Sequence, residues 1–93
     1  MTGWNFPDPT LLGWDAYADQ WQDILNELPT PPRHLQHDCG IPVTARIVWE
    51  RDGLELVDTI AYAWFGRTVL VEILDPRLYT HGVWVHASDV RRR

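Results

Sequence analysis

The feature that most constrains the fold of this chain is a pair of alternating apolar stretches separated by a tight turn. Residues 43–50 alternate apolar and polar side chains, and residues 54–64 do so again after Arg51-Asp52-Gly53. A period of two is typical of a half-buried β-strand, and Asp-Gly between two such stretches indicates a β-hairpin. The sequence therefore predicts a long antiparallel hairpin across the middle of the chain.

Shorter strands are predicted after this hairpin. Residues 68–74 follow a second turn, Phe65-Gly66-Arg67, and are apolar on nearly both faces, as in a central strand that is covered on both sides. Residues 83–85 form another short strand, and residues 87–90 form a single helical turn. Together these elements predict a small antiparallel barrel of about four to five strands over residues 43–93.

The C-terminal stretch from Gly82 to Val90 resembles the end of an SH3-like barrel, where a short strand leads into a one-turn 3-10 helix and a closing strand. The resemblance covers about residues 41–93 and implies the barrel fold, which serves many functions. The peptide-binding residues of true SH3 domains are not matched. Their aromatic–acidic segment and Trp pair are absent, and His86 stands where the groove proline is usual. Binding of proline-rich peptides is therefore not implied.

An amphipathic helix is predicted over residues 14–28, before the Pro-rich break that begins at Pro29. Acidic residues recur every four positions on one face, and such like charges destabilise an isolated helix. We therefore expect the opposite, apolar face to be packed on the barrel, over Ala61 and Ala63. That apolar face consists of Trp14, Tyr17, Ala18, Trp21, Ile24, Leu25 and Leu28.

The length of 93 residues suffices for one small domain. We divide it into an arm (1–13), the helix (14–28), a Pro-rich connector (29–42) and the barrel (43–93). The expected fold class is α+β: a small antiparallel SH3-like β-barrel with one N-terminal amphipathic helix packed on it.

Charge is unequally distributed along the sequence. The net charge is −5, and residues 1–32 carry five acidic residues and no basic one. Residues 33–93 balance eight Arg against eight acidic residues, and the chain contains no Lys. Because binding to nucleic-acid phosphates needs a basic excess, this balance favours a protein partner with a basic surface.

The N-terminal third is therefore the predicted contact surface. Carboxylates steer a basic partner toward it, and aromatic side chains anchor the complex. The competing interpretation is that the aromatic residues only cover the barrel and that the carboxylates are only solvated, while a homodimer is a further alternative. The predicted partner-binding residues are Trp4, Phe6, Trp14, Asp15, Asp19, Trp21, Asp23 and Glu27.

The sequence patterns for a metal site, for catalysis and for nucleic-acid binding are weaker. His34, His37 and Cys39 are metal-ligating types at short spacing, and His81 or His86 would be needed to complete a zinc site. No catalytic residue, cofactor or enzymatic activity is predicted, because no triad signature or Gly-rich phosphate loop is present. The main alternative is a nucleic-acid-binding barrel. It would use Arg46, Arg51, Arg67, Arg77 and Arg91–Arg93.

The remaining expectations concern the setting of the protein. No apolar run approaches the about 18 residues of a membrane span, and residues 1–8 lack the features of a secretory signal. The single Cys39 cannot form an internal disulfide, which is typical of the reducing cytosol. The use of Arg without Lys is typical of GC-rich genomes. We therefore expect a cytoplasmic protein, with a small phage protein that inactivates a host protein as one hypothesis.

Overall fold

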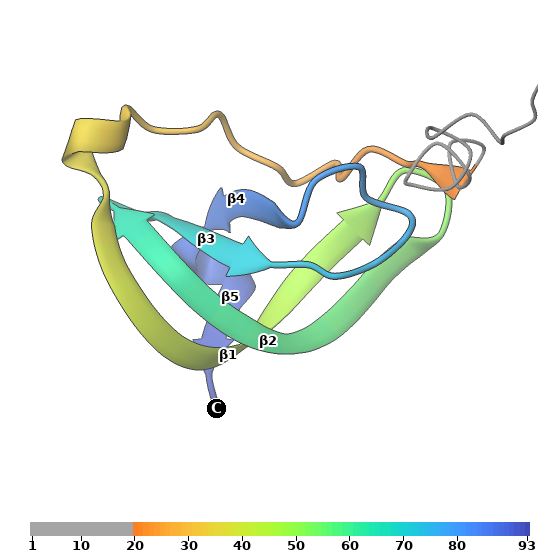
Figure 1. Cartoon of the computed structure of the whole chain (residues 1–93). Coiled ribbons are helices and arrows are strands. Elements are labelled where there is room, and N and C mark those ends of the chain that lie inside the picture. The colour runs from red at the N-terminus through yellow and green to blue at the C-terminus, as the bar shows by residue number, and fades with distance from the viewer. Residues whose placement is uncertain (1–19) are drawn as a thin grey trace, which may run out of the picture.

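The computed structural model describes residues 20–93, which contain five antiparallel strands joined by loops and short 3-10 turns (Figure 1). The sheet order is β4-β3-β2-β1-β5. The strands are β1 (His37–Trp49), β2 (Gly53–Phe65), β3 (Thr68–Glu72), β4 (Gly82–His86) and β5 (Val90–Arg92), and the 3-10 turns are η2 (Arg33–Leu35) and η3 (Ala87–Asp89).

The long central hairpin is confirmed. Strands β1 and β2 pair from His37 opposite Trp64 to Trp49 opposite Gly53, and both bend strongly along their length (Figure 1). Gly53 has φ of 79°, a left-handed conformation that glycine adopts at little cost in a tight hairpin turn. Strand β1 begins at His37 rather than at residue 43, so the predicted connector contributes its last residues to the sheet.

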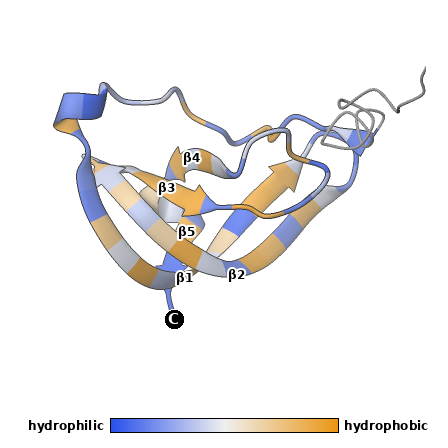
Figure 2. Cartoon of the chain, viewed as in Figure 1, coloured by the Kyte–Doolittle hydropathy of each residue, from blue (hydrophilic) through white to orange (hydrophobic). Residues whose placement is uncertain are grey.

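The alternating pattern of β1 places one set of side chains in the core. Val43, Ala45, Ile47 and Trp49 are all buried, while Arg46 and Thr44 lie toward solvent, and Figure 2 shows apolar and polar residues alternating along the strand. Buried side chains of β2, β3, β4 and the loop after β3 meet this face. They are Ala61, Val71, Ile73, Val83 and Val85.

The C-terminal end follows the predicted order of a strand, one 3-10 turn and a closing strand. Strand β4 leads through η3 into β5, which pairs with β1 from Val43 opposite Arg92 to Ala45 opposite Val90. This pairing brings the last strand against the first, so the five-stranded sheet is compatible with a small β-barrel-like fold.

The predicted amphipathic helix is the main correction. No α-helix occurs in residues 20–93. Residues 20–32, which we call the strap, run across β1 and β4 without a regular helix, and a single turn between Ile24 and Glu27 interrupts their path (Figure 1). Residues 14–19 lie outside the described residues. The expected α+β class with a packed helix is therefore wrong for the described part of the chain, which consists of strands and short 3-10 turns.

Hydrogen bonds to the sheet explain why the strap is not an α-helix. Ile24 forms an antiparallel bridge with Trp49, and Glu27 forms one with Val85. The N–H of Leu25 donates to the carbonyl of Val48 at 2.7 Å, so the strap uses the edge of β1 that β5 leaves open. Backbone groups at such an edge need partners, and the acidic repeat disfavours the competing helix.

The strap also buries different side chains from those that a helix would bury. Ile24 is 4% exposed and belongs to the core, whereas its neighbour Leu25 is 63% exposed. A helical face would have placed both of these residues against the barrel. Farther along, the N–H of Leu28 donates to the carbonyl of Trp84 at 2.7 Å, which secures the strap to the free edge of β4.

Candidate functional site

The end of the molecule that carries the β1–β2 turn is organised around one arginine. Arg77 lies in the β3–β4 loop (residues 73–81), and its guanidinium donates to both carboxylate oxygens of Asp75 at 2.8 and 2.9 Å. It also donates to Glu55 at 2.7 Å and to Asp52 at 3.1 Å. The guanidinium carbon lies 4.1 Å from the ring centroid of Trp49, a cation–π distance. Arg77 therefore joins the loop to both strands of the hairpin.

The electrostatics follow from these contacts. Hydrogen bonding to Arg77 lowers the pKa of Asp75, and hydrogen bonds from Gln22 and then Arg77 lower the pKa of Asp52. The pKa of Arg77 is raised, chiefly by its hydrogen bonds to Asp75. Asp52, Asp75 and Arg77 are thus each stabilised in the charged form, and their opposite charges compensate one another.

Two side-chain amides fix the strap to this framework. Gln22 donates to Asp52 at 2.9 Å, and its oxygen accepts from the N–H groups of Arg51 and Asp52. Asn26 donates to the carbonyl of Arg46 at 2.8 Å, and its oxygen accepts from the N–H of Val48 at 3.0 Å. Sequence reasoning missed both residues, because an isolated Gln or Asn in a polar stretch forms no recognisable motif.

A cleft lies where the strap meets the β3–β4 loop. It has a volume of about 290 Å³, and its walls include Trp21 and Asp23 on the strap and Leu78 and Tyr79 on the loop. The rings of Trp21 and Tyr79 meet edge to face, with centroids 4.8 Å apart. Tyr79 is 54% exposed and the nearby Leu74 is 72% exposed, so the loop presents apolar surface beside the cleft.

Three carboxylates line the same cleft. Asp23 and Glu27 come from the strap, and Glu50 comes from the turn that follows β1. Within residues 20–93, the carboxylates of Asp23 and Glu27 make no ion pair or hydrogen bond. Glu50 accepts from the N–H of Asp23 at 3.2 Å and lies 3.9 Å from the guanidinium of Arg51. The cleft thus combines aromatic rings with largely uncompensated negative charge.

The structure brings together part of the predicted contact surface. Trp21, Asp23 and Glu27 all line the cleft, although on an extended strap rather than on a helical ridge. Sequence reasoning missed Glu50 and Tyr79, which the turn and the loop bring to the same place. The other predicted partner-binding residues lie outside the described residues; these are Trp4, Phe6, Trp14, Asp15 and Asp19.

The residues considered for a metal site have other contacts. His37 stacks on Trp64 with ring centroids 4.5 Å apart, and the thiol of Cys39 donates to the carbonyl of Ala61 at 3.3 Å. Burial raises the pKa of Cys39, and the charge of Asp38 raises it further. Residues 20–93 contain no group of three or more His, Cys, Asp or Glu side chains that could hold a metal ion, and His34 belongs to no such group.

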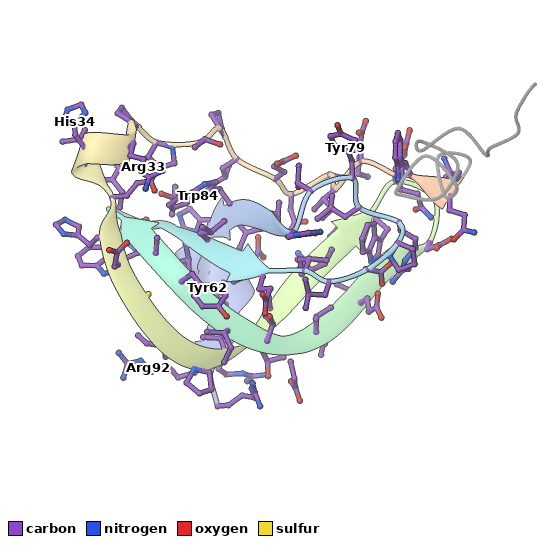
Figure 3. The ribbon with its side chains drawn as sticks, in the orientation of Figure 1. Arg33, His34, Tyr62, Tyr79, Trp84 and Arg92 are labelled. Atoms are coloured by element: carbon purple, nitrogen blue, oxygen red, sulfur yellow. The ribbon has the colours of Figure 1, made fainter. Side chains whose placement is uncertain are left out.

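Several arginines of the nucleic-acid alternative are occupied by the protein itself. Arg46 pairs with Asp89 at 3.4 Å, and Arg77 is held in its own network. Arg93 donates to the carbonyls of Val43 and Thr59. Figure 3 shows Arg33, His34 and Arg92 at the end of the molecule remote from Tyr79.

No protein-family model matches the chain, and neither a curated protein nor a solved structure matches it. Among residues 20–93, no helix has the length and apolar character needed to cross a membrane.

Proposed function

We propose that this protein is a protein–protein interaction module that binds a partner with a basic surface through the strap and the β3–β4 loop. The observation that carries the proposal is the pair of uncompensated carboxylates, Asp23 and Glu27, beside the exposed ring of Tyr79. Unpaired charge speeds the encounter with a surface of opposite charge, and buried aromatic anchors slow dissociation.

The rigidity of the surface supports the same function. Hydrogen bonds of Gln22 and Asn26 fix the strap, and Arg77 fixes the loop that faces it. A surface that is already ordered loses little conformational entropy when a partner binds. The exposed side chains are therefore held in fixed positions, which favours binding of a specific partner over nonspecific binding.

The proposal includes an SH3-like barrel as the fold that carries the surface, and a cytoplasmic location. An SH3-like barrel is supported by the strand order and by the 3-10 turn between β4 and β5. A role in the cytoplasm as a phage-type protein that inactivates a host protein is the more specific form of the function. It predicts that expression arrests growth of the host, and that changing Asp23 and Glu27 relieves the arrest.

Affinity capture with a matched control tests the binding function. The tagged full chain, an Asp23→Asn/Glu27→Gln variant and an Asp38→Asn/Glu72→Gln variant are compared with lysate of the source organism. Both variants lose the same charge, but only the first pair lines the cleft. We expect one protein to be captured by the wild type and the control, lost by the strap variant, and released by high salt. Equal capture by all three proteins, insensitive to salt, would refute the proposal.

A further inference from the structure

We infer that the cleft between the strap and the β3–β4 loop takes an arginine side chain of the partner. This inference rests on the proposed function, because it identifies which group of a basic protein the surface recognises. It is argued from the way in which the same molecule holds its own Arg77, a short distance along the chain from the cleft.

The environment of Arg77 shows what this fold uses to hold a guanidinium. Asp75, Glu55 and Asp52 accept its hydrogen bonds, and the ring of Trp49 lies against its face. Three carboxylates and one indole therefore surround a single arginine. Planar guanidinium groups suit such sites, because their fork of donors bonds to carboxylates while their face stacks on an aromatic ring.

The cleft repeats this composition. Its carboxylates are Asp23, Glu27 and Glu50, and its rings are Trp21 and Tyr79. Arg51 is not part of the cleft wall. It donates to the backbone carbonyl of Trp21 at 3.2 Å and lies 3.9 Å from Glu50. Within residues 20–93, therefore, no cation compensates Asp23 or Glu27.

The lack of a metal-type cluster among residues 20–93 bears on what kind of cation fits the cleft. The three acidic side chains line one cleft, but they do not converge as metal ligands do among the described residues. A compact metal ion would need that convergence. An arginine side chain can instead extend between the carboxylates and the rings, and its guanidinium loses hydration more readily than the ammonium of lysine.

An NMR titration of the full-length protein tests the inference. The probes are Nα-acetyl-arginine amide and Nα-acetyl-lysine amide, and the signals are the Trp21 indole N–H and the Tyr79 ring. We expect saturable shifts with affinity for the arginine compound at least about three-fold higher than for the lysine compound. Asp23→Asn/Glu27→Gln should weaken binding of the arginine compound about five-fold. The control Asp38→Asn/Glu72→Gln should leave the affinity unchanged.

The outcomes separate this inference from the proposed function. Absence of saturable shifts at the cleft, equal affinity for the two compounds, or equal loss in both variants would overturn the arginine site. If capture of a protein partner still depends on Asp23 and Glu27, the proposed function survives that failure. Conversely, an arginine-selective cleft without any captured partner would leave the cleft chemistry intact and refute the proposed function.

Discussion

Replacing Arg77 by alanine is the most informative perturbation of this fold. The side chain of Arg77 is 23% exposed and bonds to Asp75, Glu55 and Asp52, while its face covers Trp49. The backbone contacts of residue 77, including its carbonyl bond to Gln22, stay in place in the Arg77→Ala variant. The substitution therefore removes the side chain beyond Cβ, including the guanidinium, and takes away the counter-charge that Arg77 supplies to Asp75, Glu55 and Asp52.

The size of the effect follows from the individual contacts. The bidentate ion pair with Asp75 contributes about 1 kcal/mol to the free energy of unfolding, and the ion pair with Glu55 contributes about 0.5 kcal/mol, after allowing for partial exposure. The contact with the Trp49 ring adds about 0.5–1 kcal/mol. We assign no energy to the contact with solvent-exposed Asp52. The free energy of unfolding should fall by about 2 kcal/mol, which corresponds to a drop in Tm of about 8–16 °C for a domain of this size.

Acid pH provides an independent check on the same network. Arg77 lowers the pKa of Asp75 below its ordinary value of 3.8, so Asp75 stabilises the fold above that pH. This stabilisation is lost as the pH falls through the lowered pKa of the folded state. The urea midpoint of the wild type should therefore decrease below about pH 4, and the decrease should be smaller in Arg77→Ala.

Thermal unfolding followed by circular dichroism measures the effect, with Arg77→Lys as the matched variant. Lysine keeps the charge but cannot bond both oxygens of Asp75 while reaching Glu55, so it should recover less than half of the lost stability. A Tm of Arg77→Ala within about 2 °C of the wild type would refute the reasoning, since this corresponds to less than about 0.5 kcal/mol. Full recovery by lysine would show that charge alone matters.

Two further predictions concern the strap and the hairpin turn. Ile24→Ala should lower the free energy of unfolding by about 2–4 kcal/mol, because Ile24 is buried. Leu25→Ala should lower it by less than about 0.5 kcal/mol, because Leu25 is exposed. Equal losses of stability in urea denaturation would argue for a helical face instead. Gly53→Ala should lower the free energy of unfolding in urea by about 1 kcal/mol, because Gly53 has a positive φ. Gly40→Ala is the control and should leave the stability unchanged, because an added Cβ meets no atom within 4 Å. Unchanged stability of Gly53→Ala would contradict the assigned turn.

The hairpin could be predicted from the sequence because its signals are local. The alternation from Val43 to Trp49 and the Asp52-Gly53 turn act between neighbouring residues, and the structure keeps both. The helix prediction failed because the spacing of Ile24, Leu25 and Leu28 also allows an extended strap. Only the free edges of β1 and β4 decide between the two, and the strap pairs with both edges.

The candidate site was predicted only in part, for a related reason. Trp21, Asp23 and Glu27 stood out through their types and spacing within one short segment. Glu50 and Tyr79 lie far from that segment in the sequence, and nothing in their local context marks them as members of the same surface. They line the same cleft because Arg77 and Gln22 hold the loop and the turn beside the strap.

The sequence by itself determined the central hairpin, the positions of the tight turns and the acidic character of the N-terminal third, since each depends on short-range patterns or on composition. The tertiary structure alone decided that residues 20–32 bridge to β1 and β4 instead of forming a helix, and that acidic and aromatic side chains meet in one cleft. The physical reason is that a backbone hydrogen bond to a sheet edge is available only after the sheet has formed, and it then outweighs the weak preference of the segment for a helix.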